Sequence, residues 1–224
     1  MDNNLQPVVA AFDLDGTLTK GGSVFPWLKR VAGRGRTWRA TMSLALPLTI
    51  GALRSSRWAD NAKERLFVKL LAGMDEQVAM AHSRTFAREH LEHEGRALLL
   101  ARLDWHRQQG HDIVIVSASP QLYVDVITED LHANGGLGTR LALDPRGRLS
   151  GGYLGKNCRG TEKLRRLDEW VAQRHYPAPP VVFAYGNSRG DRRMLSGATH
   201  PFNAGKLGLL GSLRQFPRLK SAEQ

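Results

Sequence analysis

An apolar run that ends in two aspartates constrains the fold of this chain more than any other feature. Val8–Ala11 is typical of a buried strand, and Asp13 and Asp15 follow it closely. Because alternate residues of a strand point to the same side, we expect both carboxylates to project together from its carboxyl end. Gly16 and Thr17 supply a turn that ends the strand. Two repelling carboxylates at one strand tip indicate a bound cation or a reaction that uses both acids.

Strand-like and helix-like segments alternate along much of the chain. Apolar runs closed by small or polar residues predict strands over Val8–Leu14, Ile113–Ser117 and Val181–Tyr185. Helical spacing predicts helices over Glu94–Gln109, Gln121–His132 and Glu162–Arg174. The alternation predicts an α/β fold, a Rossmann-like parallel sheet with helices on both faces. Ligands of such sheets bind at the carboxyl ends of the strands, where the two aspartates are expected.

A long segment interrupts this alternation. Residues 21–109 show helical periodicity and no convincing strand, so we predict an inserted α-helical cap there, with a catalytic core formed by residues 1–20 and 110–224. Turn residues between two short alternating runs predict a hairpin over Leu141–Tyr153. The glycine-rich stretch Gly135–Gly138 follows a predicted helix and is expected to be a connection. Residues from Lys220 onward are expected to form a frayed tail.

Composition indicates which kinds of partner the protein binds and which cellular compartment suits it. The formal net charge is +11, which favours anionic partners such as phosphorylated metabolites, acidic lipid surfaces or nucleic acid. Basic residues are spread without aromatic interleaving, which disfavours nucleic acid. A single cysteine, Cys158, excludes an intrachain disulfide framework and suits a reducing compartment. No secretory signal is visible at the amino terminus, so we expect a cytoplasmic protein, with peripheral membrane association left open.

Two further segments carry residues suited to phosphate chemistry. Ser117 ends the second predicted strand, and Ser119 and Pro120 suit the N-cap and first position of the next helix. That helix amino terminus is expected to face the same crevice, and exposed amides there bind phosphate well. Lys163 lies in the first turn of a later helix, behind the expected N-cap Thr161. A cation there opposes the helix dipole unless an anionic ligand binds nearby.

Four motifs in order resemble those of the haloacid dehalogenase superfamily, whose members mostly transfer phosphoryl groups through an aspartyl-phosphate. They are Phe12–Thr19 for motif I, Ser117 for motif II, Gly160–Lys163 for motif III and Gly186–Asp191 for motif IV. Motif IV departs from the family pattern, because Asn187 replaces the usual first aspartate while Asp191 remains. A metal could therefore bind the carbonyl oxygen of Asn187 or the carboxylate of Asp191, or the metal site could be degraded.

The resemblance implies a mechanism and a set of site residues. Asp13 is expected to attack phosphorus, and Asp15 to protonate the leaving group and later activate water. Mg²⁺ is expected as cofactor, with the metal candidates Asp13, Asp15, Asn187 and Asp191. Phosphate-binding candidates are Ser117, Lys163, Gly16, Thr17 and Ala118. Substrate-contact candidates are Asn157, Arg159 and Trp27.

The predicted cap contains an uncharged apolar segment, Ala40–Leu53, flanked by arginines and by Trp38 and Trp58. It is too short to span a bilayer, and Pro47 interrupts it. It is either a buried helix pair or a surface that dips into anionic membrane and presents lipid phosphates to the site. The pattern resembles the cap of bacterial phosphatidylglycerophosphate phosphatases. Lys20–Val24 lacks the glutamate with which phosphoserine phosphatases bind the substrate amine, which disfavours an amino-acid phosphate.

Three classes of function remain open from the sequence. The first is a Mg²⁺-dependent phosphatase that acts on a phosphorylated small molecule or lipid. The second is a catalytically weak protein that binds anionic partners, either nucleic acid or membrane. The third is a phosphotransferase that passes the phosphoryl group to an alcohol other than water, since this reaction would also proceed through Asp13.

Overall fold

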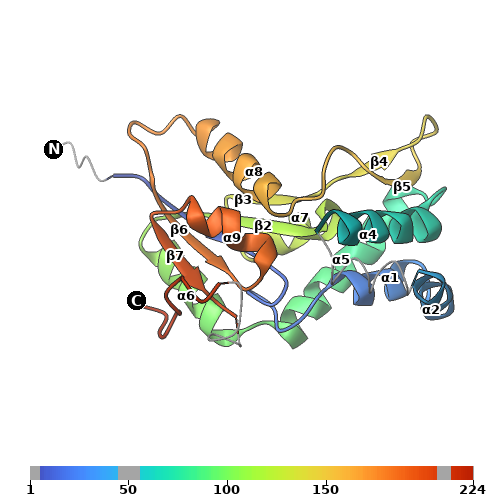
Figure 1. Ribbon diagram of the computed structural model, residues 1–224, viewed down its shortest axis with the longest axis horizontal. Helices are drawn as coiled ribbons and strands as arrows, with labels where there is room; N and C mark the ends of the chain where they lie inside the picture. Colours follow the sequence, from blue (N-terminus) through green and yellow to red (C-terminus); the bar gives the residue numbers. More distant parts are fainter. Residues whose placement is uncertain (1–5, 45–55, 206–212, 224) are drawn as a thin grey trace.

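A parallel sheet forms the centre of the protein. The computed structural model describes residues 6–44, 56–205 and 213–223. Its five-stranded sheet has the order β3-β2-β1-β6-β7, with every neighbouring pair parallel. The strands are β1 (Val8–Phe12), β2 (Asp112–Pro120), β3 (Gly135–Thr139), β6 (Val181–Gly186) and β7 (His200–Asn203). Helices lie on both faces of this sheet (Figure 1), so the predicted α/β fold is confirmed.

Strand β1 is buried on both sides, which explains its uninterrupted apolar sequence. Val9 and Ala11 join the apolar cluster on one face, and Ala10 and Phe12 join the cluster on the other. The core helices are α6 (Ala97–Gln108), α7 (Gln121–Asp130), α8 (Thr161–Ala172) and α9 (Arg192–Ser196). Side chains of α6 and α7 share the cluster of Phe12, whereas those of α8 and α9 share the cluster of Val9.

The cap is helical and packs beside the sheet (Figure 1). Its described helices are α1 (Val24–Val31), α2 (Arg34–Ser43), α4 (Ser56–Leu71) and α5 (Glu76–Glu94). Trp27 lies at its centre, with its ring 6.0 Å from that of Phe67 on α4 and 5.5 Å from that of Tyr123 on α7. Cap and core therefore share one apolar cluster. Most of the predicted apolar segment, residues 45–53, lies outside the described residues.

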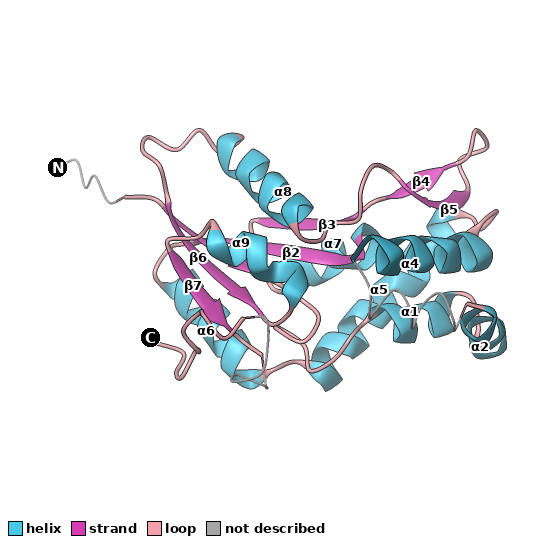
Figure 2. Ribbon diagram, viewed as in Figure 1, coloured by secondary structure: helices cyan, strands magenta, loops and turns pink. Residues whose placement is uncertain are grey.

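The predicted hairpin is confirmed, and it contacts the cap. Strands β4 (Leu141–Leu143) and β5 (Leu149–Tyr153) pair antiparallel and lie beside α4 (Figure 2). Gly151 has a φ of +80°, and a Cβ added there would lie 2.4 Å from the Cα of Val68. Only glycine allows this close approach between the hairpin and the helix.

Helix α6 belongs with the sheet although the sequence placed it in the cap. The Nε of Arg102 donates a hydrogen bond to the Tyr185 hydroxyl on β6 at 2.6 Å. Leu99 and Leu103 of the same helix are fully buried in the cluster of Phe12. We therefore propose that the cap ends near Gly95 rather than at Gln109.

Two predicted helix starts differ by one or two residues. Strand β2 continues to Pro120, which pairs with Thr139, so Pro120 is the N-cap of α7 and the Ser119 hydroxyl is used elsewhere. The N-cap of α8 is Gly160, whose φ of +61° favours glycine, and Thr161 is the first helical residue. Lys163 nevertheless lies in the first turn, as predicted.

Two segments expected to be irregular are ordered. The glycine-rich stretch after α7 is the edge strand β3, because its glycines let helix α7 lie close to the strand. A Cβ on Gly136 would lie 2.3 Å from the Thr128 hydroxyl. The tail beyond Lys220 is held in part, since the Ala222 carbonyl accepts a hydrogen bond from Arg102 at 2.8 Å. Among the helices that the structure describes, none has both the length and the apolar character to cross a bilayer.

Candidate active site

A buried ion network joins three elements at the carboxyl ends of the strands. Asp13 directly follows β1 and is 5% exposed. Its Oδ1 accepts a hydrogen bond from the Nζ of Lys163 at 2.5 Å, and its Oδ2 accepts one from the Thr17 hydroxyl at 2.9 Å. The same ammonium donates to Oδ1 of Asp191 at 2.6 Å, at the end of the 3₁₀ helix Arg189–Asp191. One cation thus lies between two carboxylates.

The network carries more negative charge than Lys163 alone can neutralise. Burial and the neighbouring Asp191 carboxylate raise the pKa of Asp13 to about 7, although Lys163 lowers it. Burial alone would lower the pKa of Lys163, but Asp13 and Asp191 outweigh it and hold that pKa above its ordinary value. Lys163 therefore stays charged, and the net negative charge of the network would stabilise a further cation.

Asp15 is held by groups from both the core and the cap. Its Oδ2 accepts a hydrogen bond from the Ser119 hydroxyl at 2.6 Å, and its Oδ1 accepts one from the backbone N–H of Ser23 at 2.8 Å. The Ser23 hydroxyl lies 3.0 Å from that of Ser119 and 2.7 Å from that of Tyr123. Ser23, Ser119 and Tyr123 were not among the predicted site residues. Ser119 follows Ser117 by two positions, and the two-residue period of a strand could have indicated it.

Asn187 presents an unpaired oxygen at the site. Its Oδ1 is buried and receives no hydrogen bond from the described residues. Asn187 approaches the turn after β1 so closely that a Cβ on Gly16 would lie 2.0 Å from its Nδ2. Gly16 has a φ of +79°, so its conformation and the close approach both require glycine.

Asp191 is fully engaged in holding the loop that carries Asn187. Its Oδ2 accepts hydrogen bonds from the backbone N–H and the hydroxyl of Ser188, at 2.9 and 2.7 Å. Its other oxygen accepts from Lys163. Asp191 therefore positions the loop and the lysine, whereas Asn187 has a free oxygen.

The oxygen atoms at the site suit a hard cation. In the described part of the chain, no three His, Cys, Asp or Glu side chains form a metal cluster by themselves. A metal would therefore also need amide or main-chain oxygens. The buried oxygen of Asn187 fits Mg²⁺, which prefers oxygen ligands, and a cation there would relieve the cost of an unpaired acceptor.

A lysine from the cap reaches the end of β2. The Ser117 hydroxyl accepts a hydrogen bond from the backbone N–H of Ser119 at 3.1 Å, and the next carbonyl, that of Ala118, accepts one from the Nζ of Lys63 at 2.6 Å. Burial lowers the pKa of Lys63 to about 8, although Asp15 and Asp60 raise it. Nothing in the sequence distinguishes Lys63 from other basic residues of its helix.

Two of the three predicted substrate contacts lie beside Lys63. The Oδ1 of Asn157 is 3.4 Å from the Nζ of Lys63, and its Nδ2 donates to Asp60 at 2.7 Å. Arg159 pairs with the same carboxylate at 3.5 Å. The structure brings these groups together at the junction of cap and core.

The prediction that Trp27 contacts substrate is wrong. Its side chain is fully buried, and its Nε1 donates a hydrogen bond to the Ser83 hydroxyl at 2.8 Å. The indole fills the apolar centre of the cap because its neighbours are the rings of Phe67 and Tyr123.

Known proteins are similar to this chain over most of its length. The haloacid dehalogenase-like hydrolase family model matches residues 10–196. Protein CicA of Caulobacter vibrioides is 34% identical over 194 residues, covering 85% of this chain and 83% of CicA. A histidinol-phosphatase of Neisseria meningitidis serogroup C is 20% identical over 195 residues, covering 86% and 88%.

Solved structures share the fold. A protein of unknown function from Bordetella pertussis Tohama I superposes with a TM-score of 0.79 at 21% identity, covering 96% of this chain and 99% of that one. A phosphoserine phosphatase solved as a phospho-aspartyl intermediate analogue gives a TM-score of 0.62 at 16% identity, covering 88% and 86%.

Proposed function

Because the chain belongs to the haloacid dehalogenase-like hydrolase family, we propose that it is a phosphatase that hydrolyses phosphomonoesters through an aspartyl-phosphate on Asp13. The observation that carries this proposal is the pairing of buried Asp13 with Lys163, next to a second aspartate held by Ser119. The names of the histidinol-phosphatase relative and of the phosphoserine phosphatase structure support the same class of reaction.

The two aspartates have different roles in this mechanism. Asp13 attacks phosphorus, the bond from phosphorus to the ester oxygen breaks, and Asp15 gives its proton to the leaving alkoxide. Water then attacks the aspartyl-phosphate and gives a proton to Asp15, which releases phosphate and restores Asp13. Lys163 and Ser117 hold the phosphoryl oxygens, where fixed polar groups stabilise the transition state.

We include Mg²⁺ in the proposal because of the free oxygen on Asn187. Asp13, Asn187 and the main-chain carbonyl of Asp15 would hold the ion, with Asp191 orienting the loop. When bound, Mg²⁺ supplies positive charge to the phosphoryl oxygens. Gly16, Thr17 and Ala118 complete the phosphate-binding set, and Thr17 already contacts the nucleophile.

Two substrate classes are supported, one by the cap and one by the named relatives. Exposed apolar side chains lie on or near basic helices, with Phe25 43%, Trp38 65% and Met42 52% exposed. They support a peripheral contact with anionic membrane and a lipid phosphate such as phosphatidylglycerophosphate. The named phosphatase relatives support a phosphorylated small molecule instead. Both classes therefore enter the test.

The test is phosphate release from a panel that includes phosphatidylglycerophosphate and soluble phosphomonoesters, with and without Mg²⁺. We expect metal-dependent turnover that falls by roughly a thousandfold or more in Asp13→Asn, because the nucleophile is lost. Asp168→Asn, an exposed aspartate on α8, is the matched control and should retain activity. Undiminished turnover in Asp13→Asn would contradict the mechanism. Absence of turnover throughout the panel would favour an anion-binding protein, and new phosphoesters formed with added alcohols would indicate a phosphotransferase.

A further inference from the structure

Arg96 lies where the chain returns from the cap to the sheet. It is the N-cap of α6 and follows Gly95, near which we place the end of the cap. Its backbone N–H donates a hydrogen bond to the Leu18 carbonyl at 2.8 Å. The Lys20 N–H donates one to the Glu94 carbonyl, also at 2.8 Å. The two segments that connect cap and core are thus paired at this point.

The guanidinium of Arg96 bridges two loops at the carboxyl ends of the strands. Its Nη1 donates to the Gly16 carbonyl, after β1, at 2.5 Å and to the Ala204 carbonyl, after β7, at 2.8 Å. In the sheet, β6 lies between β1 and β7. The loop after β6 carries Asn187, so Arg96 holds the loops on either side of it.

The loop of Asn187 lies close to both of these neighbours. On one side, a Cβ on Gly16 would lie 2.0 Å from the Nδ2 of Asn187. On the other side, a Cβ on Gly205, the residue after Ala204, would lie 3.2 Å from the main-chain oxygen of Asn187. The three loops are therefore packed together, and Arg96 ties the outer two to each other.

The peptide group between Gly16 and Thr17 links Arg96 to Asp13. Arg96 holds the carbonyl oxygen of this peptide, and its N–H donates to the Leu14 carbonyl at 3.2 Å. The Thr17 hydroxyl donates to Oδ2 of Asp13 at 2.9 Å. Holding this peptide in place therefore holds the hydroxyl that orients the Asp13 carboxylate.

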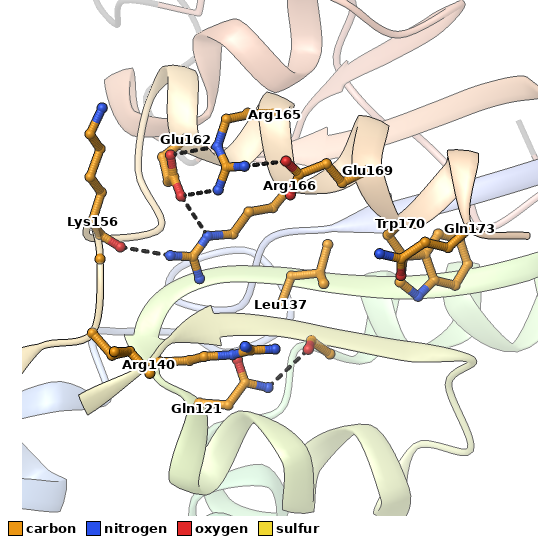
Figure 3. Close-up of a pocket in the computed structure, with 13 residues that line it drawn as sticks. Gln121, Leu137, Arg140, Lys156, Glu162, Arg165, Arg166, Glu169, Trp170 and Gln173 are labelled. Carbon is orange, nitrogen blue, oxygen red and sulfur yellow. Dashed lines mark hydrogen bonds and ion pairs between the residues drawn. The ribbon is translucent and has the colours of Figure 1, made fainter. Parts of the chain in front are cut away.

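Unlike two arginines of α8, Arg96 pairs with no carboxylate among the described residues. Figure 3 shows the contrasting arrangement, in which Arg165 and Arg166 donate to the Glu162 carboxylate at 2.6 and 2.8 Å. Partial burial lowers the pKa of the Arg96 guanidinium, with no acid to oppose the effect. Hydrogen bonds from a charged donor are strong, so the charge of Arg96 acts mainly on the two main-chain oxygens.

We infer that Arg96 is a positioning residue, which keeps the turn of Gly16 and Thr17 and the loop of Asn187 in the arrangement that the reaction needs. It acts through the two carbonyls and does not touch the reacting atoms. Because its backbone also pairs with Leu18, one residue holds both the loops and the connection to the cap. Its effect on catalysis rests on the proposed phosphatase function, whereas its effect on the loops does not.

The first test measures the turn after β1 in the protein without substrate. The N–H groups of Thr17 and Thr19 donate to the Leu14 carbonyl at 3.2 and 3.0 Å, so their hydrogen exchange reports on this turn. Measured by NMR, exchange at both should be about tenfold faster in Arg96→Met, because the turn loses a hydrogen bond from a charged donor.

Two controls distinguish a held loop from a stabilised fold. The amide of Ile115, which is buried in β2, should keep its exchange rate in Arg96→Met to within about twofold. Arg107→Met is the matched variant, because Arg107 belongs to α6 and donates to a main-chain carbonyl remote from the site, that of Leu131. It should leave exchange in the turn after β1 unchanged.

The second test measures turnover of the substrate that the phosphatase panel identifies. The kcat of Arg96→Met should fall by about tenfold or more while KM changes by less than about threefold, because Arg96 acts on the placement of Asp13 and not on substrate. Arg96→Lys should lose less, since one ammonium can donate to both carbonyls as Nη1 does. Arg107→Met should keep the kcat of the unsubstituted protein.

Three results would overturn the inference. The first is exchange at Thr17 and Thr19 that stays unchanged in Arg96→Met. The second is exchange that rises equally at Ile115, which would make Arg96 a residue of general stability. The third is faster exchange in the turn with an unchanged kcat. Absence of turnover in the unsubstituted protein would instead contradict the proposed function, and exchange would still decide whether Arg96 holds the loops.

Discussion

At the scale of single residues, the site is a set of charges that the fold would not keep for stability alone. Lys163 and Asp191 are almost fully buried, and Asp13 is nearly so. Removing such ions from water costs several kcal/mol each, which their mutual attraction offsets only with good geometry. The raised pKa of Asp13 shows that the offset is incomplete. A bound cation would neutralise the remaining negative charge.

Asn187→Asp tests the metal site directly. A carboxylate in place of the unpaired amide oxygen should tighten Mg²⁺ binding by about tenfold, or about 1.4 kcal/mol, because a charged oxygen binds a hard cation more strongly. Calorimetric titration with Mg²⁺ measures this change, and Asn61→Asp on the exposed side of α4 is the control. An unchanged or weaker affinity would count against Asn187 as a ligand.

Lys63→Met tests the cap residue that reaches the site. With a pKa of about 8, Lys63 is charged at neutral pH and loses its proton as the pH rises through 8. Binding of a substrate whose leaving group is anionic should therefore weaken above pH 8, so that KM rises with pH there. In Lys63→Met this rise, the alkaline limb of the KM profile, should be absent, and KM at pH 7 should be about tenfold higher. KM measured from pH 6 to 10 decides the matter, with Lys69→Met on the same helix as control. A limb that persists in Lys63→Met would exclude the lysine as its source.

Sequence reasoning selected several core residues that lie together in the structure. It missed Ser119 and Tyr123 of the core as well as residues of the cap. Asp13 and Asn187 directly follow strands β1 and β6, and Lys163 lies in the first turn of α8, so local pattern was enough to select them. Lys63 and Ser23 reach the site only because cap helices fold back onto the sheet. That packing depends on contacts far apart in the sequence, which a local pattern does not encode.

At the scale of elements, the contact between hairpin and cap depends on one glycine. Gly151→Ala should lower the free energy of unfolding by about 3 kcal/mol, from a strained positive φ and from a Cβ 2.7 Å from the carbonyl oxygen of Phe67. Gly147→Ala is the matched control, because Gly147 has a φ of +74° with no atom within 4 Å, and it should cost only about 1 kcal/mol. Urea unfolding of both variants gives the comparison. Equal losses would mean that the close approach carries no energy.

Elements with strong patterns were predicted, and weakly patterned ones were not. The apolar runs of β1, β2 and β6 are long enough to indicate buried strands. Strand β3 consists largely of glycine and is extended because β2 pairs with it. Strand β7 has only four residues, His200–Asn203, and takes its register from β6. Pairing with a neighbour, rather than intrinsic preference, decides such strands.

At the scale of the whole molecule, the net charge of +11 and the exposed apolar side chains of the cap bear on a membrane contact. We expect sedimentation with vesicles that contain anionic lipid at low salt, release at high salt, and no sedimentation with neutral vesicles. Trp38→Ser should weaken binding several-fold at fixed charge, whereas Leu98→Ser on core helix α6 should not. Failure to sediment at low salt would remove the support for a lipid substrate.

The hydrogen bond from Ser23 to Asp15 has a consequence for the order of events in a catalytic cycle. Ser23 lies just before the first cap helix, α1. Lys63, on cap helix α4, donates a hydrogen bond to the Ala118 carbonyl. If the cap swings away to admit substrate or release product, Asp15 loses one of its two partners at the same moment. Asp15 then has both partners for proton transfer only while the cap keeps solvent out of the site. The cap would therefore allow the reaction only in its closed position.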